Sequence, residues 1–312
     1  MGNALQPLLV LVGPTATGKS ELAVDVALRL RELGTAAEVV NADSMLVYKG
    51  MDIGTAKPPR SERRGIPHHL IDIWDVTHRA TVAEFQGLAR QSIADIRARG
   101  AVPILVGGSA LYTRAVIDQF EFQPFDPAVR ECWEEELARR GAAELHAELA
   151  KIAPGSAEQI DPGNGRRLVR ALEIAELSGG HVPNLPKWTY ALANVHQFGL
   201  WMARSELDLR VDMRVEAMWE QGLVDEVRRL LARGLRDGVT ASRAIGYRQV
   251  ISYLDAELTE NEAKEATKKA TRRFVRRQLA WYRRDERISW LPVNGDDNSK
   301  QILSAVELNP RN

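Results

Sequence analysis

Short apolar runs alternate with amphipathic segments over roughly the first hundred residues of the chain. The runs predict four buried strands, at Leu8–Val12, Glu38–Ala42, His69–Ile73 and Val102–Val106. One amphipathic helix follows the first run, and a second is expected over Val82–Arg99. Strands that alternate with helices in this way are typical of an α/β protein with a parallel sheet flanked by helices.

From about Phe122 the pattern becomes helical, with helices expected over Asp126–Leu149 and Arg166–Leu177. Nothing in residues 122–194 predicts a strand. We therefore expect an all-helical insertion domain at 122–194, inside a core formed by residues 1–121 and 195–312.

The chain is expected to return to the sheet at Val195–Met202 and then to form long helices over Glu206–Arg233 and Glu260–Arg284. Thr259 and Glu262 have the spacing of a capping box at the start of the second long helix. The last fifteen or so residues carry little pattern, so we expect them to be poorly ordered.

Composition narrows the class of protein only slightly. The 312 residues are 45% hydrophobic and 27% charged, which is ordinary for a soluble globular chain. No apolar run approaches the ~20 residues of a membrane span, and the N-terminus lacks the features of a secretory signal. A single cysteine, Cys132, excludes an internal disulfide. We expect a cytoplasmic protein that does not bind membranes.

The formal net charge is zero, but charge is separated along the chain. Between Lys264 and Arg287, ten Lys and Arg residues accompany only Glu265, Asp285 and Glu286. A stripe of this kind is often only a solvated helix face. Because acidic partners at helical spacing are scarce here, the stripe also fits an anionic ligand such as nucleic acid.

The most specific short motif follows the first predicted strand. It matches the phosphate-loop pattern G-x-x-x-x-G-K-[ST] at Gly13, Pro14, Thr15, Ala16, Thr17, Gly18, Lys19 and Ser20. Its backbone N–H groups and the start of the next helix would cradle a polyphosphate. Lys19 would add a full charge, and the Ser20 hydroxyl suits a Mg²⁺ ion held by the same phosphates.

Two polar residues follow neighbouring predicted strands, Asp43 after the second and Ser109 after the fourth. Both could simply cap a turn or helix. Because strand ends meet at one edge of a parallel sheet, both could instead lie beside the bound phosphates. A carboxylate and a hydroxyl there suit either phosphoryl transfer or a reaction in which diphosphate leaves and a base takes a proton.

Further segments resemble one known family. They are Asp43–Pro58, Pro67–Asp72, Val106–Tyr112, Arg170–Glu173, Ile245–Gln249 and Arg277–Trp281. With the phosphate loop, these segments make the chain similar to the tRNA dimethylallyltransferases, also called tRNA isopentenyltransferases, over roughly residues 8–291. The Asp43–Pro58 block is much more specific than the phosphate loop, which many families share.

The resemblance implies that the loop binds the diphosphate of dimethylallyl diphosphate, with Mg²⁺ and with Arg210. The dimethylallyl group would pass to N6 of the adenine that is 3′-adjacent to the anticodon of tRNA. Asp43 matches the presumed general base, and Ser109 matches a hydroxyl that places the amine and the leaving oxygen. We also expect a monomer.

The resemblance further implies a set of tRNA-binding residues in the core and in the insertion. They are Asp43, Ser44, Met45, Leu46, Ser109, Arg130, Arg166, Arg167, Leu168, Val169, Arg170, Arg243, Gly246, Tyr247, Arg248, Arg276, Arg277, Gln278, Trp281 and Arg283. The insertion would hold the anticodon stem-loop. Several positions depart from the commonest family pattern. Thr17 and Ser20 stand where Ser and Thr are frequent, Ser109 replaces a frequent Thr, Leu46 replaces a frequent Gln, and Gly165–Arg167 is irregular.

Two other enzymes remain compatible with parts of this pattern. A transferase that prenylates free adenylate would share the phosphate loop and the base, but it would not need the insertion or the basic helix. A phosphate-loop nucleotide kinase would need ATP and would leave the Asp43–Pro58 block without a role. A noncatalytic RNA-binding module would leave the phosphate loop idle.

Overall fold

The computed structural model describes residues 5–120, 122–180, 188–295 and 297–306. The chain forms two compact units, a core of residues 1–118 and 190–312 and an insertion of residues 119–189. The expected boundary at 194 differs because Tyr190 belongs to the core, where its hydroxyl accepts a hydrogen bond from Gln197.

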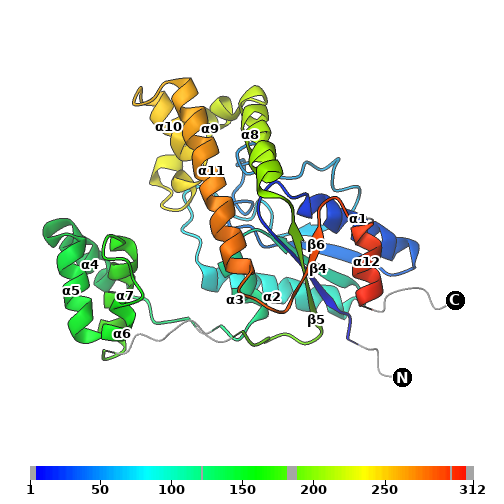
Figure 1. Ribbon diagram of the computed structural model, residues 1–312, viewed down its shortest axis with the longest axis horizontal. Coiled ribbons are helices and arrows are strands. Elements are labelled where there is room, and N and C mark those ends of the chain that lie inside the picture. Colours follow the sequence, from blue (N-terminus) through cyan, green and yellow to red (C-terminus); the bar gives the residue numbers. More distant parts are fainter. Residues whose placement is uncertain (1–4, 121, 181–187, 296, 307–312) are drawn as a thin grey trace. The chain divides into compact units, whose positions relative to one another are not determined.

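A six-stranded sheet lies at the centre of the core (Figure 1). Its order is β3 (His68–His69), β2 (Ala37–Asn41), β4 (Val102–Gly107), β1 (Leu8–Val12), β5 (Val195–Trp201) and β6 (Ile288–Pro292), and every pair is parallel. Strand β1 is central and entirely buried, which explains why its sequence is continuously apolar.

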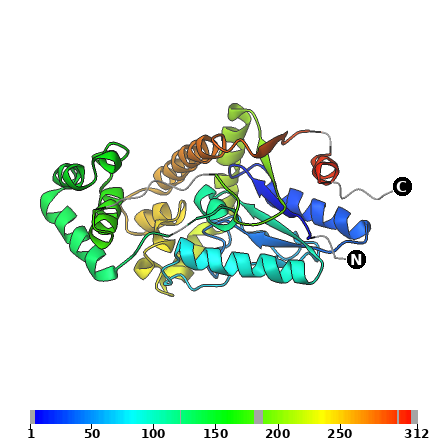
Figure 2. The same ribbon diagram turned by 90° about the horizontal axis from the view of Figure 1, so that it is seen from below.

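Helices cover both faces of the sheet, as predicted. Side chains of β1 alternate between two apolar clusters: Leu8, Val10 and Val12 enter one, and Leu9 and Leu11 enter the other. The first cluster includes α2 (Val82–Ala98) and α3 (Ala110–Ile117), and the second includes α1 (Lys19–Glu32) and α12 (Asn298–Ala305). Figure 2 shows α2 running along one side of the strands.

The rest of the core is helical. It comprises α8 (Arg204–Glu220), α9 (Leu223–Leu231), α10 (Tyr247–Leu254), α11 (Glu260–Tyr282) and two short 3₁₀ turns, Leu235–Asp237 and Ala241–Arg243. The predicted capping box at Thr259 and Glu262 is present at the start of α11.

The described part of the insertion is helical. It contains α4 (Pro127–Arg140), α5 (Ala142–Ile152), α6 (Pro154–Ala157) and α7 (Gly165–Leu177). An apolar cluster of its own includes Leu145, Leu149, Leu168 and Leu172.

Several predicted elements need correction. The third strand is only two residues long because Leu70 and Asp72 have φ of 61° and 56°, which breaks an extended backbone. The helices predicted over Asp126–Leu149 and Glu206–Arg233 are each divided at a glycine with positive φ, Gly141 and Gly222. Strand β6 and helix α12 were not predicted, and α12 occupies part of the C-terminal stretch expected to be poorly ordered.

Candidate active site

The phosphate loop connects β1 to α1, as its sequence predicts. Gly13 has φ of 140°, and a Cβ atom there would lie 2.7 Å from the Leu200 carbonyl oxygen, so only glycine fits. Gly18 has φ of 82° at the start of α1. The Thr17 hydroxyl and the Lys19 ammonium both donate to the Pro14 carbonyl, which closes the loop on itself.

A pocket of about 220 Å³ opens in front of this loop. Its lining residues come from segments far apart in the sequence and are Thr15, Ala16, Gly18, Lys19, Ser20, Glu21, Asp43, Leu46, Thr55, Ala56, Pro58, Glu62, Val106, Gly107, Gly108, Arg214 and Gln278. Strands β2 and β4 end at this edge of the sheet, which brings the residues that follow them to the phosphate loop.

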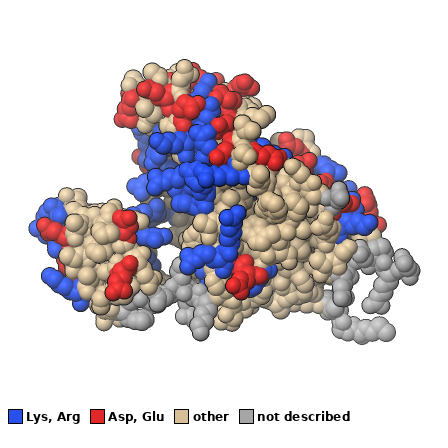
Figure 3. All heavy atoms as spheres, in the orientation of Figure 1, with Lys and Arg blue, Asp and Glu red and all other residues tan. Residues whose placement is uncertain are grey.

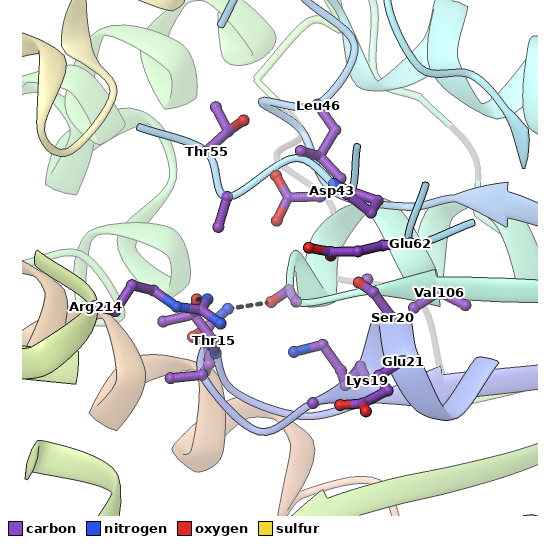
Figure 4. A pocket seen from close by; sticks show the side chains of 17 residues that line it. Thr15, Lys19, Ser20, Glu21, Asp43, Leu46, Thr55, Glu62, Val106 and Arg214 are labelled. Atoms are coloured by element: carbon purple, nitrogen blue, oxygen red, sulfur yellow. Dashed lines mark hydrogen bonds between the residues drawn. The ribbon is translucent and has the colours of Figure 1, made fainter. Parts of the chain in front are cut away.

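Asp43 and Lys19 face each other across the pocket (Figure 4). Asp43 Oδ1 accepts a hydrogen bond from the Met45 N–H group at 2.8 Å, which fixes the carboxylate after β2. Burial raises the pKa of Asp43, although the N–H group of Met45 and the charge of Lys19 act in the opposite direction.

The surroundings of Lys19 disfavour its charged form. Burial lowers its pKa to about 7, the Asp43 carboxylate acts against this shift, and the Arg214 guanidinium adds to it. An anion bound between Lys19 and Arg214 would stabilise both side chains in their positively charged forms. The pocket is therefore suited to a phosphate-bearing ligand, with a carboxylate on its far side.

The arginine at this pocket is Arg214, one helical turn after the expected Arg210. Arg214 lines the pocket and donates to the Thr15 hydroxyl at 3.1 Å, and burial lowers its pKa. Arg210 is not among the lining residues, and it pairs with Glu206 at 3.2 Å. Sequence spacing could have raised this alternative, since residues four apart share a helix face.

Ser109 begins helix α3 and does not line the pocket. Its hydroxyl lies 3.2 Å from the Ser44 hydroxyl and accepts from the Ser44 N–H group at 3.3 Å. The structure thus brings Ser109 next to the segment that carries Asp43. The Ser109 hydroxyl is hydrogen-bonded to Ser44 of that segment.

A buried carboxylate that the sequence did not reveal holds the wall of the pocket. Glu226 is 3% exposed and accepts hydrogen bonds from the N–H groups of Asp52, Ile53 and Gly54. It also accepts from the Tyr247 hydroxyl at 2.6 Å. This network fixes the segment that leads to Thr55, Ala56 and Pro58 on the pocket wall.

The structure buries two of the residues that were predicted to bind tRNA, Tyr247 and its neighbour Gly246. Tyr247 is fully buried, and burial together with Glu226 raises its pKa well above the ordinary value. Gly246 is also buried. In this structure neither residue is exposed at the surface. Lys57 is structural too, because its ammonium pairs with Asp52 and Asp72.

Replacing Tyr247 with phenylalanine removes one donor to a buried carboxylate. We expect the free energy of unfolding to fall by about 1.5–3 kcal/mol in urea titrations, as for other hydrogen bonds to charged groups. The affinity for RNA should not change. Tyr253→Phe is the matched control, because no hydrogen bond of the Tyr253 hydroxyl is present in the described part of the chain. An RNA-binding defect in a stably folded Tyr247→Phe protein would contradict the assignment.

The predicted RNA-binding residues divide into exposed and buried groups. The exposed arginines are Arg166, Arg167, Arg243, Arg248, Arg276, Arg277 and Arg283. Leu168 and Val169 belong to the apolar cluster of the insertion, and Gln278 is 5% exposed in the core. Trp281, Ser44 and Met45 are half-buried.

Two arginines of the insertion form ion pairs inside that unit. Arg130 pairs with Glu134 and Glu173, and Arg170 also pairs with Glu173. Arg170 further donates to the Pro124 and Gln123 carbonyls. Both guanidinium groups are therefore paired with other groups of the insertion.

The basic stripe of α11 is partly neutralised by acidic residues of α8, which the spacing within the stripe itself could not reveal. Arg272 pairs with Asp212, and Lys268 pairs with Glu216 and Glu265. The remaining cations form an exposed face, here called the basic face of α11: Lys269, Arg273, Arg276, Arg277, Arg283 and Arg284. Among the described residues none of these six forms an ion pair. Figure 3 shows the resulting band of Lys and Arg.

The residues at the pocket fit a magnesium ion only as a partner of bound phosphates. Ser20 is exposed to the pocket, and its hydroxyl is a suitable single ligand. Within the described ranges no group of three or more His, Cys, Asp and Glu residues could hold a metal ion. Since Mg²⁺ usually takes most of its ligands from phosphates and water, one protein hydroxyl is compatible with it.

Fold and site together define a phosphate-loop protein in which the phosphate loop and a carboxylate lie on opposite sides of one pocket. A sequence model of the IPP transferase family matches residues 46–285. The chain belongs to this family, which confirms the resemblance, the fold class and the assignment as a transferase.

Curated relatives agree with this assignment over nearly the whole chain. A protein of Thermobifida fusca named tRNA dimethylallyltransferase is 54% identical and covers 97% of this chain and 95% of the relative. A protein of the same name from Kineococcus radiotolerans is 53% identical, with coverage of 99% and 98%.

Solved structures show the same architecture. The tRNA isopentenylpyrophosphate transferase of Bacillus halodurans has 41% identity and a TM-score of 0.70, over 97% of this chain and 95% of that one. A eukaryotic dimethylallyltransferase acting on tRNA has 25% identity and a TM-score of 0.77, over 98% and 80%. None of the described helices is long and apolar enough to cross a membrane.

Proposed function

We propose that this chain transfers the dimethylallyl group of dimethylallyl diphosphate to N6 of the adenine 3′-adjacent to the anticodon of tRNA. The observation that carries the proposal is the pair of Lys19 and Asp43 on opposite sides of one pocket. The relatives named tRNA dimethylallyltransferase support the choice of acceptor.

The charges in the pocket match the charges that this reaction develops. As the allylic carbon–oxygen bond breaks, the diphosphate gains negative charge, which the loop N–H groups, Lys19 and Arg214 are placed to stabilise. Asp43 accepts the N6 proton as the new carbon–nitrogen bond forms. Mg²⁺ on Ser20 would neutralise further charge on the diphosphate when bound. An unstacked anticodon-loop base can enter such a pocket, whereas a paired base cannot.

The two units differ in net charge, which supports a proposal about the RNA-binding surface. The insertion, residues 119–189, holds eight of the 42 Lys and Arg residues but twelve of the 42 Asp and Glu residues. It is therefore acidic, and the core is correspondingly basic. RNA phosphates should contact the basic face of α11, and the insertion should contribute through the exposed Arg166 and Arg167 at the start of α7.

The basic face of α11 gives a prediction about salt. Replacing Arg273, Arg276 and Arg277 together with glutamine should weaken tRNA binding. It should also lower the slope of log affinity against log salt by about 2–3, since each phosphate contact contributes about one. Filter binding at several salt concentrations measures both. Arg31→Gln on α1 is the control and should leave the slope unchanged. An unchanged slope in the triple variant would place the RNA elsewhere.

The acceptor is tested by mixing the protein with labelled dimethylallyl diphosphate, Mg²⁺ and either undermodified tRNA or AMP. We expect label in tRNA and, after digestion, in N6-dimethylallyladenosine. Label in AMP alone would establish the adenylate transferase instead. A parallel mixture of the protein with AMP, ATP and Mg²⁺ tests the remaining alternative, because conversion of AMP and ATP to two ADP would establish a nucleotide kinase.

We further propose that the protein acts as a monomer in the cytoplasm. The pocket of one chain already holds the phosphate loop, Lys19, Arg214 and Asp43, which are the groups that the proposed reaction uses. Light scattering of the free protein and of its tRNA complex tests the monomer: one protein per complex is expected, and a stable dimer would contradict it.

A further inference from the structure

One buried side chain connects the two loops that frame the pocket. Gln278 of α11 is 5% exposed. Its Oε1 atom accepts from the Thr15 N–H group at 3.1 Å, and its Nε2 atom donates to the Gly108 carbonyl at 2.8 Å. Thr15 belongs to the phosphate loop, and Gly108 directly precedes Ser109. A single amide thus spans the distance between the phosphate cradle and the residues that follow β4.

The fit around this amide is close. A Cβ atom on Gly108 would lie 2.4 Å from Gln278 Nε2, so the loop after β4 reaches the amide only because it has glycine there. The tip of the phosphate loop rests on the same helix, since Ala16 shares an apolar cluster with Val275 and Leu279. The position of the phosphate loop therefore depends on α11.

Gln278 and the basic face lie on opposite sides of α11. Gln278 is nine residues after Lys269, about two and a half helical turns, which places it across the helix from that cation. Gln278 borders the pocket and is only 5% exposed, so it is not part of the surface that the basic face of α11 presents to RNA. One helix thus presents charge on its outer side and holds the phosphate loop on its inner side.

We infer that Gln278 is a positioning residue for the transfer reaction. It keeps the phosphate loop in register with Gly108 and Ser109, so that the leaving diphosphate stays correctly placed relative to the attacking amine. The expected effect on turnover rests on the proposed function, whereas the effect on diphosphate binding does not.

Gln278→Met tests this role because methionine preserves the length of the side chain and removes both hydrogen bonds. We expect kcat to fall about 10- to 100-fold, as for other small misplacements of reacting groups, with KM for tRNA unchanged. Gln278→Glu can still accept from Thr15, but it cannot donate to Gly108 when ionised and it adds negative charge beside the phosphates. This second variant should raise KM for dimethylallyl diphosphate more than Gln278→Met does.

Gln197→Met is the matched control for lost stability. Gln197 is also 5% exposed, donates to the Tyr190 hydroxyl and to Asp285, and does not line the pocket. We expect it to lower Tm to a similar extent as Gln278→Met and to leave kcat unchanged. Wild-type kcat in Gln278→Met, or a defect confined to KM for tRNA, would overturn the inference.

Calorimetric titration with inorganic pyrophosphate, without RNA, separates this inference from the proposed function. Weaker pyrophosphate binding by Gln278→Met, with unaltered binding by Gln197→Met, supports the positioning role even if tRNA proves not to be the acceptor. Equal pyrophosphate affinity in wild type and Gln278→Met would remove the link between α11 and the phosphate loop.

Discussion

Replacing Asp43 with asparagine is expected to lower kcat by about two to four orders of magnitude, the range for loss of a general base. Asparagine has the same size, and its oxygen can still accept the Met45 N–H group, so the loop after β2 should keep its shape. Rapid-quench measurement of prenyl transfer to tRNA gives the rate of the chemical step.

Donor affinity separates loss of the base from damage to the pocket. Asp43 carries negative charge toward an anionic ligand, so its removal should leave the affinity for dimethylallyl diphosphate unchanged or higher. The comparison belongs at about pH 6, because Asp43 raises the pKa of Lys19 and its loss would otherwise discharge that lysine at neutral pH. Asp75→Asn, an exposed carboxylate outside the pocket, serves as control. A large loss of affinity with normal turnover would contradict the base assignment.

Replacing Lys19 with methionine should reduce kcat/KM for the donor by about 10²–10³, the typical effect of removing one donor that stabilises developing negative charge. The variant should bind both the donor and the inhibitor pyrophosphate more weakly, because both ligands contain the diphosphate group that Lys19 contacts. Fluorescence or calorimetric titration of pyrophosphate provides the affinity directly. Wild-type affinity in Lys19→Met would mean that the diphosphate binds elsewhere.

The pH dependence of kcat/KM should reflect the titration of both Asp43 and Lys19, since this parameter reports the free enzyme. Activity should rise with pH as Asp43, whose pKa is raised by burial, loses its proton. Activity should then fall as Lys19 loses its proton near its pKa of about 7. In Lys19→Met the fall on the alkaline side should disappear. Persistence of that fall would assign it to another group.

The phosphate loop and Asp43 could be predicted because their positions follow from local rules. The loop motif specifies its own backbone, and a residue directly after a parallel strand must lie at the ligand-binding edge of the sheet. Apolar runs such as Leu8–Val12 identify strands buried on both faces for the same reason. These features depend on residues that are close together in sequence.

The features that sequence did not predict depend on contacts between distant segments. Helical periodicity places Arg210 and Arg214 on neighbouring positions, but the packing of α8 decides that only Arg214 reaches the pocket. Glu226 meets the N–H groups of Asp52 and Ile53 from more than 170 positions away along the chain. A buried carboxylate and an exposed one look the same in a single sequence.

A structure of the protein bound to an unreactive thio analogue of dimethylallyl diphosphate and an anticodon stem-loop would show whether the diphosphate, the adenine and Asp43 meet in this pocket. We expect the diphosphate to contact Lys19 and Arg214, and N6 of the flipped adenine to lie about 2.6–3.2 Å from the Asp43 carboxylate. The amine and the diphosphate should lie on opposite sides of the allylic carbon. A diphosphate outside the phosphate loop, or an adenine amine with no approach to Asp43, would contradict the proposed reaction.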